Sequence, residues 1–143
     1  MSLSTGDPLA HRALESLLRA EAAIRRRLSG ELEREGLSAS GFSVLVVLTT
    51  AGGELELRAL RARLRTSKAN ATEVVTTLES RGLVSRFRLA HDRRAASVRL
   101  TTAGRELVER VFPEHTERVG NAFAALDETE KRQLSDICRK LAA

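Results

Sequence analysis

The feature that most constrains the fold is a change in the spacing of apolar side chains between residues 57 and 102. Leu57, Leu60 and Leu64 recur at helical spacing, and the apolar residues of 67–81 repeat the i, i+3, i+4, i+7 pattern of a second helix. Residues 83–89 and 96–100 instead alternate between apolar and polar side chains, which is typical of strands. This order predicts two helices, a β-hairpin, and a polar hairpin tip at residues 90–95.

Local signals mark where these elements begin and end. Ser67 is placed to cap the second helix, because a serine at that position accepts a backbone N–H from the first turn, where Asn70 lies. Gly82 is typical of the residue that follows a helix, and Thr101 or Thr102 is placed to cap another one. Two helices at a sharp angle followed by a hairpin form a winged helix-turn-helix. The predicted fold class is therefore mainly α with a small β-wing.

Positive charge is concentrated in the same segment. Between Arg58 and Arg99 there are eleven basic and three acidic residues, a net charge of +8, whereas the whole chain carries +5. A helix fits the DNA major groove, and arginines at a hairpin tip can reach the adjacent minor groove. Because a phosphate-binding surface needs its charge where the binding motif lies, this segment predicts binding to double-stranded DNA.

The rest of the chain predicts helices on both sides of this segment. A long amphipathic helix spans 9–35, and a helix over 39–50, capped by Ser38 or Ser40, is apolar nearly all round and should be buried. Residues 54–56 are expected to form a short third strand. A helix from 102 to about 123 contains Pro113, which should kink or split it. Asp127 and Glu130 form a capping box at the start of the last helix.

The apolar faces at the two ends of the chain exceed what one winged helix can bury. They predict a homodimer in which residues 1–36 and 103–143 pair across a two-fold axis. Residues 37–102 would form the DNA-binding lobe, with a recognition helix at about 67–81 and a wing at about 83–101. Cys138 lies on the C-terminal apolar face, where we expect a small buried side chain rather than a redox switch.

Several classes of protein are not favoured by the sequence. No apolar run approaches the ~20 residues of a membrane span, so no membrane partner is predicted. One cysteine fits a reducing cytoplasm, which is the expected location. The three histidines lie far apart, and no metal-binding, phosphate-loop or serine-nucleophile motif is present. We therefore expect no enzyme activity, no metal and no cofactor.

Three patterns follow the segment LSASGFSVLVVL, which begins at Leu37: Leu-Glu-x-x-Gly-Leu-Val-x-Arg, then Asp-x-Arg, then Leu-Thr-x-x-Gly. Through them the chain from Leu37 onward resembles the MarR family of bacterial transcriptional regulators. The residues concerned are Leu78, Glu79, Gly82, Leu83, Val84, Arg86, Asp92, Arg94, Leu100, Thr101 and Gly104. The resemblance implies a homodimer that binds pseudo-palindromic operators, with a repressor as the expected role.

The same resemblance implies that a small ligand or oxidation often releases the DNA. The usual ligand cavity would lie between the dimerisation helices and the DNA-binding lobe. Here it would be lined mainly by Leu, Val, Ala and Phe, because the chain has no Tyr or Trp, which suggests a small apolar effector. Phe42 is the one residue we name as a candidate lining, and membership of the ordinary core is its alternative.

The predicted DNA contacts come from the recognition helix, the turn before it and the wing. We expect one group to face base edges: Lys68, Asn70, Thr72 and Thr76. We expect a second group to contact the DNA backbone or support the wing: Arg65, Ser67, Arg86 and Arg88. At the wing tip, Arg94 should enter the minor groove beside Arg93, with Asp92 orienting an arginine by a charge-assisted hydrogen bond.

Glu73 departs from the family pattern. Family members often carry a basic residue at the position of Glu73 and another at that of Thr77, so this recognition helix is poor in positive charge. Glu73 either reads a cytosine amino group, or faces a protein neighbour, or marks a modest specific affinity. The low charge also supports an alternative function, namely a winged-helix architectural or protein-interaction module without sequence preference.

Overall fold

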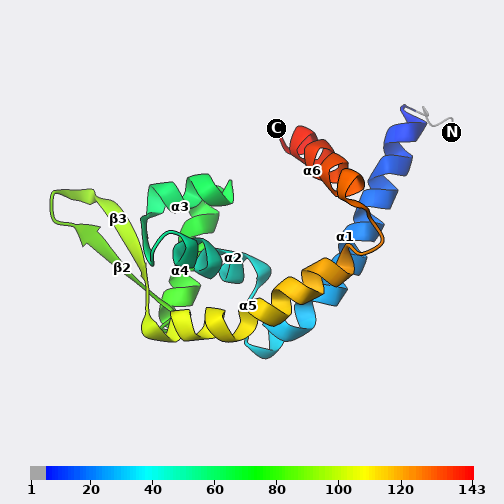
Figure 1. Ribbon diagram of the computed structural model, residues 1–143. Coiled ribbons are helices and arrows are strands. Elements are labelled where there is room, and N and C mark those ends of the chain that lie inside the picture. Colours follow the sequence, from blue (N-terminus) through cyan, green and yellow to red (C-terminus); the bar gives the residue numbers. More distant parts are fainter. Residues whose placement is uncertain (1–5) are drawn as a thin grey trace, which may run out of the picture. The chain divides into compact units, whose positions relative to one another are not determined.

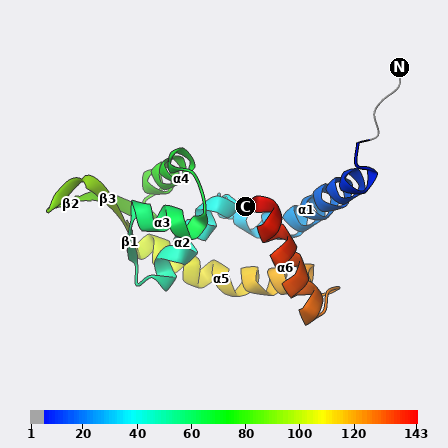
Figure 2. The same ribbon diagram turned by 90° about the horizontal axis from the view of Figure 1, so that it is seen from above.

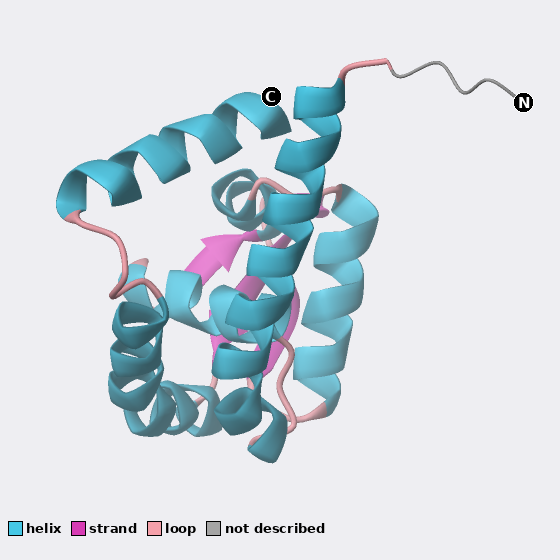
Figure 3. Cartoon of the chain, turned by 90° about the vertical axis from the view of Figure 1, so that its right-hand side faces the viewer, coloured by secondary structure: helices cyan, strands magenta, loops and turns pink. Residues whose placement is uncertain are grey.

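The structure is a computed structural model that describes residues 6–143, except for the side chain of Arg93. The described residues form six helices and three strands (Figure 1), and the strands make one small sheet (Figure 3). The predicted fold class is therefore confirmed. The chain divides into two compact units, Glu31–Glu114, called the winged-helix unit below, and Met1–Gly30 with His115–Ala143, called the terminal unit.

The winged-helix unit contains the predicted helix-turn-helix and hairpin. Its complete elements in chain order are α2 (Ala39–Thr50), β1 (Glu54–Glu56), α3 (Leu57–Leu64), α4 (Lys68–Ser80), β2 (Val84–Leu89) and β3 (Asp92–Leu100). The hairpin of β2 and β3, called the wing below, extends beyond α2, α3 and α4 (Figure 2). The expected helices at 57–64 and 39–50 and the third strand at 54–56 are confirmed, and the helix expected at about 67–81 is α4.

The sheet has the antiparallel order β1-β3-β2. Val98 of the central strand pairs with Leu55 on one side and with Arg86 on the other, and its side chain is fully buried. The alternating pattern that predicted strands therefore places one face of the sheet against the helices. The sheet is anchored to the core at its centre, while its far end carries the wing tip.

The wing differs from the expected six-residue tip at 90–95. β3 begins at Asp92, which pairs with Leu89, so the turn consists of Ala90 and His91 alone. The next pair toward the core is Arg88 with Ala96, which leaves residues 93–95 as extra residues in β3. A β-bulge of this kind breaks the two-residue alternation, and for that reason the apolar pattern did not reveal the strand.

One hydrophobic core joins the helices to the sheet. Its fully buried side chains include Leu45 and Leu48 of α2, Leu60 of α3 and Val75 of α4. Phe42 is 3% exposed and belongs to this core, as the alternative to a cavity lining predicted. The nearly continuous apolar sequence of α2 is explained by this central position.

The start of α5 (Thr102–Ala122) is fixed against the base of the wing. Thr101 caps the helix, since its hydroxyl accepts the Gly104 N–H at 3.1 Å and donates to the Gly82 carbonyl at 2.7 Å. A Cβ on Gly104 would lie 2.2 Å from the Leu83 carbonyl oxygen. The start of α5 therefore lies so close to the backbone of Leu83 that only glycine fits at this position. α5 also continues through Pro113 as one helix, so the split is excluded, and the kink that was its alternative stays a prediction.

The terminal unit contains most of α1 (Pro8–Arg34), the end of α5 and all of α6 (Glu128–Ala142). The Asp127–Glu130 capping box is confirmed. Among the described residues, every buried hydrophobic side chain belongs to the winged-helix unit and none to this one. Cys138 is accordingly exposed in the single chain, and the expectation that it is buried is wrong for the isolated subunit. Residues 1–5 of the expected 1–36 segment lie outside the described residues.

Candidate nucleic-acid interface

The turn between α3 and α4 is short and held by its own side chains. Arg65 ends α3 in the left-handed conformation, with φ 53° and ψ 44°. Ser67 caps α4 by accepting the Asn70 N–H at 3.1 Å, as predicted. The Asn70 amide also donates to the Thr66 hydroxyl at 2.7 Å, so the first turn of α4 is tied to the residues before it. The left-handed conformation of Arg65 lets the chain change direction between α3 and α4 within residues 65–67.

The outward face of α4 follows from its helical geometry. Ala71, Val75 and Leu78 are buried against the core. With ~100° between successive residues, the opposite side of the helix carries Ala69, Glu73, Thr76 and Ser80. Each of these four residues is exposed. Ala69 and Ser80 were not among the predicted contacts, because only the direction of the core, which the structure gives, places them on this face.

The other predicted base contacts lie beside this outward face. Asn70 and Thr77 are exposed along one flank, and Lys68 is exposed at the first turn. Thr72 is half-buried, like the residues that border the core, and it lies on the other flank. The structure thus brings the predicted residues onto one helix but spreads them over more than half of its circumference.

Glu79 connects the recognition helix to the wing. Its carboxylate accepts the backbone N–H of Arg86 at 2.9 Å and a guanidinium N–H of the same residue at 3.3 Å. The predicted role of Arg86 in supporting the wing has this geometry as its basis. The Leu-Glu-x-x-Gly pattern contained the signal, because it fixes a carboxylate one turn before the glycine that leads into β2.

At the wing tip, Asp92 organises the backbone. Its carboxylate accepts the backbone N–H of Arg94 at 3.0 Å, which holds the first residues of the bulge. We expected Asp92 to accept a hydrogen bond from an arginine side chain, but from Arg94 it accepts the backbone N–H instead. The guanidinium groups of Arg88 and Arg94 lie on exposed residues, and the side chain of Arg93 lies outside the described part of the structure.

Arg81 fixes the other end of α4. Its guanidinium donates to the carbonyls of Glu35 at 2.7 Å and Gly36 at 2.8 Å, where α1 has just ended. Glu35 in turn accepts two hydrogen bonds from Arg110 of α5, and these bonds lower the pKa of Glu35. No sequence signal indicates the Arg81 contact, because its partners are backbone carbonyls 45 and 46 residues away.

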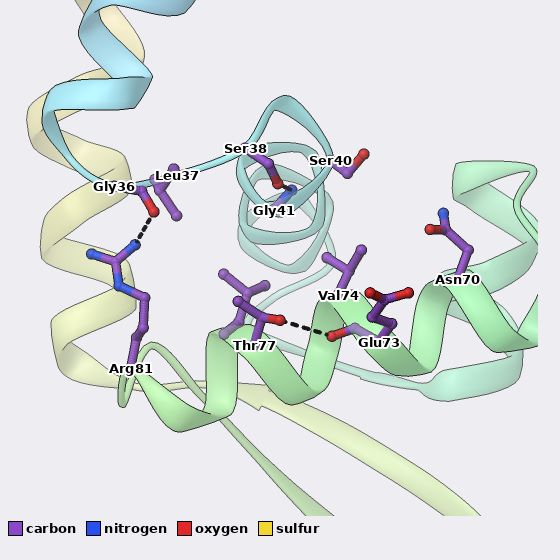
Figure 4. Close-up of a pocket in the computed structure, with 11 residues that line it drawn as sticks. Gly36, Leu37, Ser38, Ser40, Gly41, Asn70, Glu73, Val74, Thr77 and Arg81 are labelled. Carbon is purple, nitrogen blue, oxygen red and sulfur yellow. Dashed lines mark hydrogen bonds between the residues drawn. The ribbon is translucent and has the colours of Figure 1, made fainter.

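A hollow of about 240 Å³ lies between α4 and the start of α2. Ser38 and Ser40 border it at the N-terminus of α2, and Asn70, Glu73 and Thr77 border it on α4 (Figure 4). Ser38 caps α2 by accepting the Gly41 N–H at 3.0 Å. The hollow is therefore lined both by polar groups and by the apolar side chains of Leu37, Val74 and Leu78, and it lies along the flank of α4 that carries Asn70 and Thr77.

Other kinds of site find no support in the described residues. No group of three or more His, Cys, Asp or Glu residues among them is arranged to hold a metal ion. None of the described helices combines the length and the apolar character needed to cross a membrane. The winged helix is thus the part of the described chain where motif, charge and exposed polar groups coincide.

Comparisons with known proteins agree with this geometry. The MarR family profile matches residues 37–96. The transcriptional repressor MprA of Escherichia coli is 32% identical over 111 residues, which are 77% of this chain and 63% of MprA, so the chain spans less than two thirds of that relative. YkoM, an uncharacterised HTH-type transcriptional regulator of Bacillus subtilis, is 31% identical over 108 residues, covering 76% of this chain and 70% of YkoM.

A solved structure is also similar over nearly the whole chain. Sco3205, a MarR family transcriptional regulator from Streptomyces coelicolor solved in complex with DNA, superposes with a TM-score of 0.82 at 26% identity. The match covers 99% of this chain and 89% of that one. These relatives are regulators of transcription, in agreement with the prediction that the chain is not an enzyme. The chain belongs to the MarR family.

Proposed function

We propose that this protein is a homodimeric transcriptional repressor that binds a pseudo-palindromic operator in the bacterial cytoplasm. The observation that carries the proposal is the exposed polar face of α4, flanked by basic residues of the turn and the wing. α4 would enter the major groove, and Arg94 would reach the minor groove beside it. Arg65, Ser67 and Arg88 would contact the phosphate backbone.

The homodimer is supported by the exposed apolar residues of the terminal unit. Large apolar side chains that are 36% to 70% exposed line α1 and α6: Leu9, Leu14, Leu17, Leu18, Leu134, Ile137 and Leu141. Large exposed apolar side chains that gather on helices mark interfaces. Pairing two copies would also place two α4 helices on successive major grooves, which are about 34 Å apart.

The test is fluorescence anisotropy on DNA from upstream of the gene and on a scrambled duplex, each at two salt concentrations. A specific regulator is expected to prefer the native fragment by ~10³-fold or more at physiological salt. Arg94→Ala should weaken binding to the native fragment. Arg19→Ala removes the same charge from an exposed position of α1 outside the winged-helix unit and should leave binding unchanged.

A second candidate function is a module that binds DNA without sequence preference. The observation that favours it is the composition of α4, which carries one lysine against two glutamates. Equal binding to both duplexes, lost as salt rises, would support this second candidate and overturn the repressor proposal, because only the phosphate contribution would then be present.

Release by a small apolar effector is also part of the proposal. The support is compositional, since the chain has neither Tyr nor Trp to line a ligand cavity. A ligand that favours a spacing of the two lobes unsuited to successive grooves would lower DNA affinity by a population shift. Apolar and aromatic acids of increasing size, added to the anisotropy assay, test this step directly.

A further inference from the structure

Glu73 lies at the centre of the outward face of α4. It stands opposite the buried Ala71, Val75 and Leu78, and its neighbours one turn away are Ala69, Asn70, Thr76 and Thr77. None of those neighbours is long enough to cover it or charged enough to neutralise it. A helix that presented this face to a major groove would place the carboxylate among the base edges.

The hydroxyl groups on this part of α4 use their O–H groups in hydrogen bonds to backbone carbonyls of the same helix. Thr76 donates to the Thr72 carbonyl at 2.8 Å, Thr77 to the Glu73 carbonyl at 3.1 Å, and Ser80 to the Thr77 carbonyl at 2.7 Å. Each of these oxygens therefore presents lone pairs outward. The face of α4 offers a carboxylate and three acceptor oxygens, and this set complements hydrogen-bond donors on DNA.

Among the described residues of the winged-helix unit, no ion pair or side-chain hydrogen bond joins the Glu73 carboxylate to a partner. Among the described ion pairs of this unit, glutamates 35, 54 and 79 have arginine partners and Glu73 does not. The basic residue beyond the end of α4, Arg81, is bonded to the carbonyls of Glu35 and Gly36 instead. The groups that border Glu73 across the hollow are the serines at the start of α2 (Figure 4).

We propose that Glu73 selects cytosine at one position of each operator half-site by accepting a hydrogen bond from the N4 amino group. The proposal rests on the DNA-binding function proposed above. Cytosine presents a donor alone in the major groove, whereas adenine places its N7 acceptor beside the N6 donor. Guanine and thymine present acceptors there, which repel a carboxylate. The carboxylate thus acts mainly by exclusion, and the arginines of the turn and wing supply the affinity.

The test is selection from a library of duplexes with a randomised central segment, followed by sequencing of the bound DNA. The wild-type protein is expected to enrich an inverted repeat with cytosine at one defined position per half-site, by about tenfold over the other bases. Glu73→Gln should shift that position toward adenine, because an amide both accepts and donates. Glu73→Ala should lose the preference there and bind unselected duplexes more tightly, since a negative charge near the phosphates is removed.

Glu33→Gln is the matched control. It removes the same charge from an exposed position of α1 in the same unit, and the enriched motif should remain that of the wild type. Thermal unfolding of each variant checks that α4 keeps its fold, and an exposed substitution is expected to change stability little.

Two results would overturn the inference, and they differ. If the wild type and Glu73→Gln enrich the same motif, Glu73 does not read a base, while the proposed function stands. If the wild type enriches no motif at all, the proposed sequence-specific function fails and the inference fails with it.

Discussion

The two units of this chain contain apolar residues in similar patterns but use them differently. In the winged-helix unit most large apolar side chains meet in one core, where Leu45 and Leu60 are fully buried, and Phe112 near the end of the unit is 43% exposed. In the terminal unit the apolar positions of α1 and α6 remain exposed, up to 70% at Leu141. Periodicity alone therefore shows that a helix has an apolar face, and the structure shows whether the same chain covers it.

The difference indicates which unit covers its own apolar surface. The winged-helix unit has its core, its capped helices and its sheet within residues 31–114. The terminal unit exposes apolar surface that water disfavours, at about 25 cal/mol for each Å². A second copy of the chain, which the proposed function supplies, would cover this surface.

Placing charge on the apolar face of α6 should dissociate the proposed dimer without unfolding the winged-helix unit. Ile137→Asp combined with Leu141→Asp is expected to convert dimers to monomers, because a carboxylate in an apolar interface is costly to bury. Loss of the second half-site contact should weaken operator binding by about 10² to 10⁴-fold. Sedimentation and anisotropy measure both effects. Thr129→Asp on the other side of α6 is the control, and a double variant that stayed dimeric would refute the assignment of this face.

Crowding the start of α5 should damage the winged-helix unit itself. Gly104→Ala would place a Cβ 2.2 Å from the Leu83 carbonyl oxygen and 2.8 Å from a Leu100 methyl carbon. Overpacking of this kind lowers the free energy of unfolding by about 1–3 kcal/mol or more. Gly120→Ala in the same helix meets no atom within 4 Å and should be neutral or slightly stabilising. Urea unfolding compares the two variants, and equal midpoints would show that the close approach is not needed.

Removing one wing cation should change affinity without changing the fold. Arg94→Ala is expected to lower DNA affinity by roughly tenfold and to reduce the slope of log affinity against log salt by about 1. Asp92→Asn tests the backbone contact separately, because an amide oxygen can still accept the Arg94 N–H. It should have the smaller effect. A salt slope identical to the wild type in Arg94→Ala would contradict the minor-groove contact.

The smallest effect concerns acid stability. The bonds from Arg110 lower the pKa of Glu35 below its ordinary value of 4.5, so this carboxylate stabilises the fold above that pH. As the pH falls through the lowered pKa, the contribution is lost. Glu35→Gln should therefore be less stable than the wild type at neutral pH and approach it in acid. Because the pair is partly exposed, the difference is expected to be small. A difference that persists in strong acid would point to packing rather than charge.

Elements that depend on local chemistry could be predicted from the sequence. Ser67, Asp127 and Thr101 cap their helices within three residues of their partners, and the short-range periodicity of α2 to α4 placed the helices to within a residue or two. The charge of the wing was likewise visible, because a count of arginines does not require a structure.

Features that depend on distant or small partners could not be predicted. The contact of Arg81 with Gly36 joins residues far apart in sequence, and no pattern encodes it. The bulge at residues 93–95 interrupts alternation, so the strand looked like a loop. Ala69 and Ser80 share the outward face with Glu73, but only the direction of the core fixes that face. The exposure of Cys138 depends on whether a partner is present, which a single sequence does not state.

The chain passes from one unit to the other twice, after Gly30 within α1 and after Glu114 within α5. Glycine is among the poorest helix formers, and Pro113 has no N–H to donate to the carbonyl four residues earlier. Each connection between the units is therefore a helix with a weakened position close to the boundary, at Gly30 in α1 and at Pro113 in α5. We expect the mechanical stiffness of this protein to be lowest there, so that small forces acting on the ends of the chain are converted into reorientation rather than into unfolding.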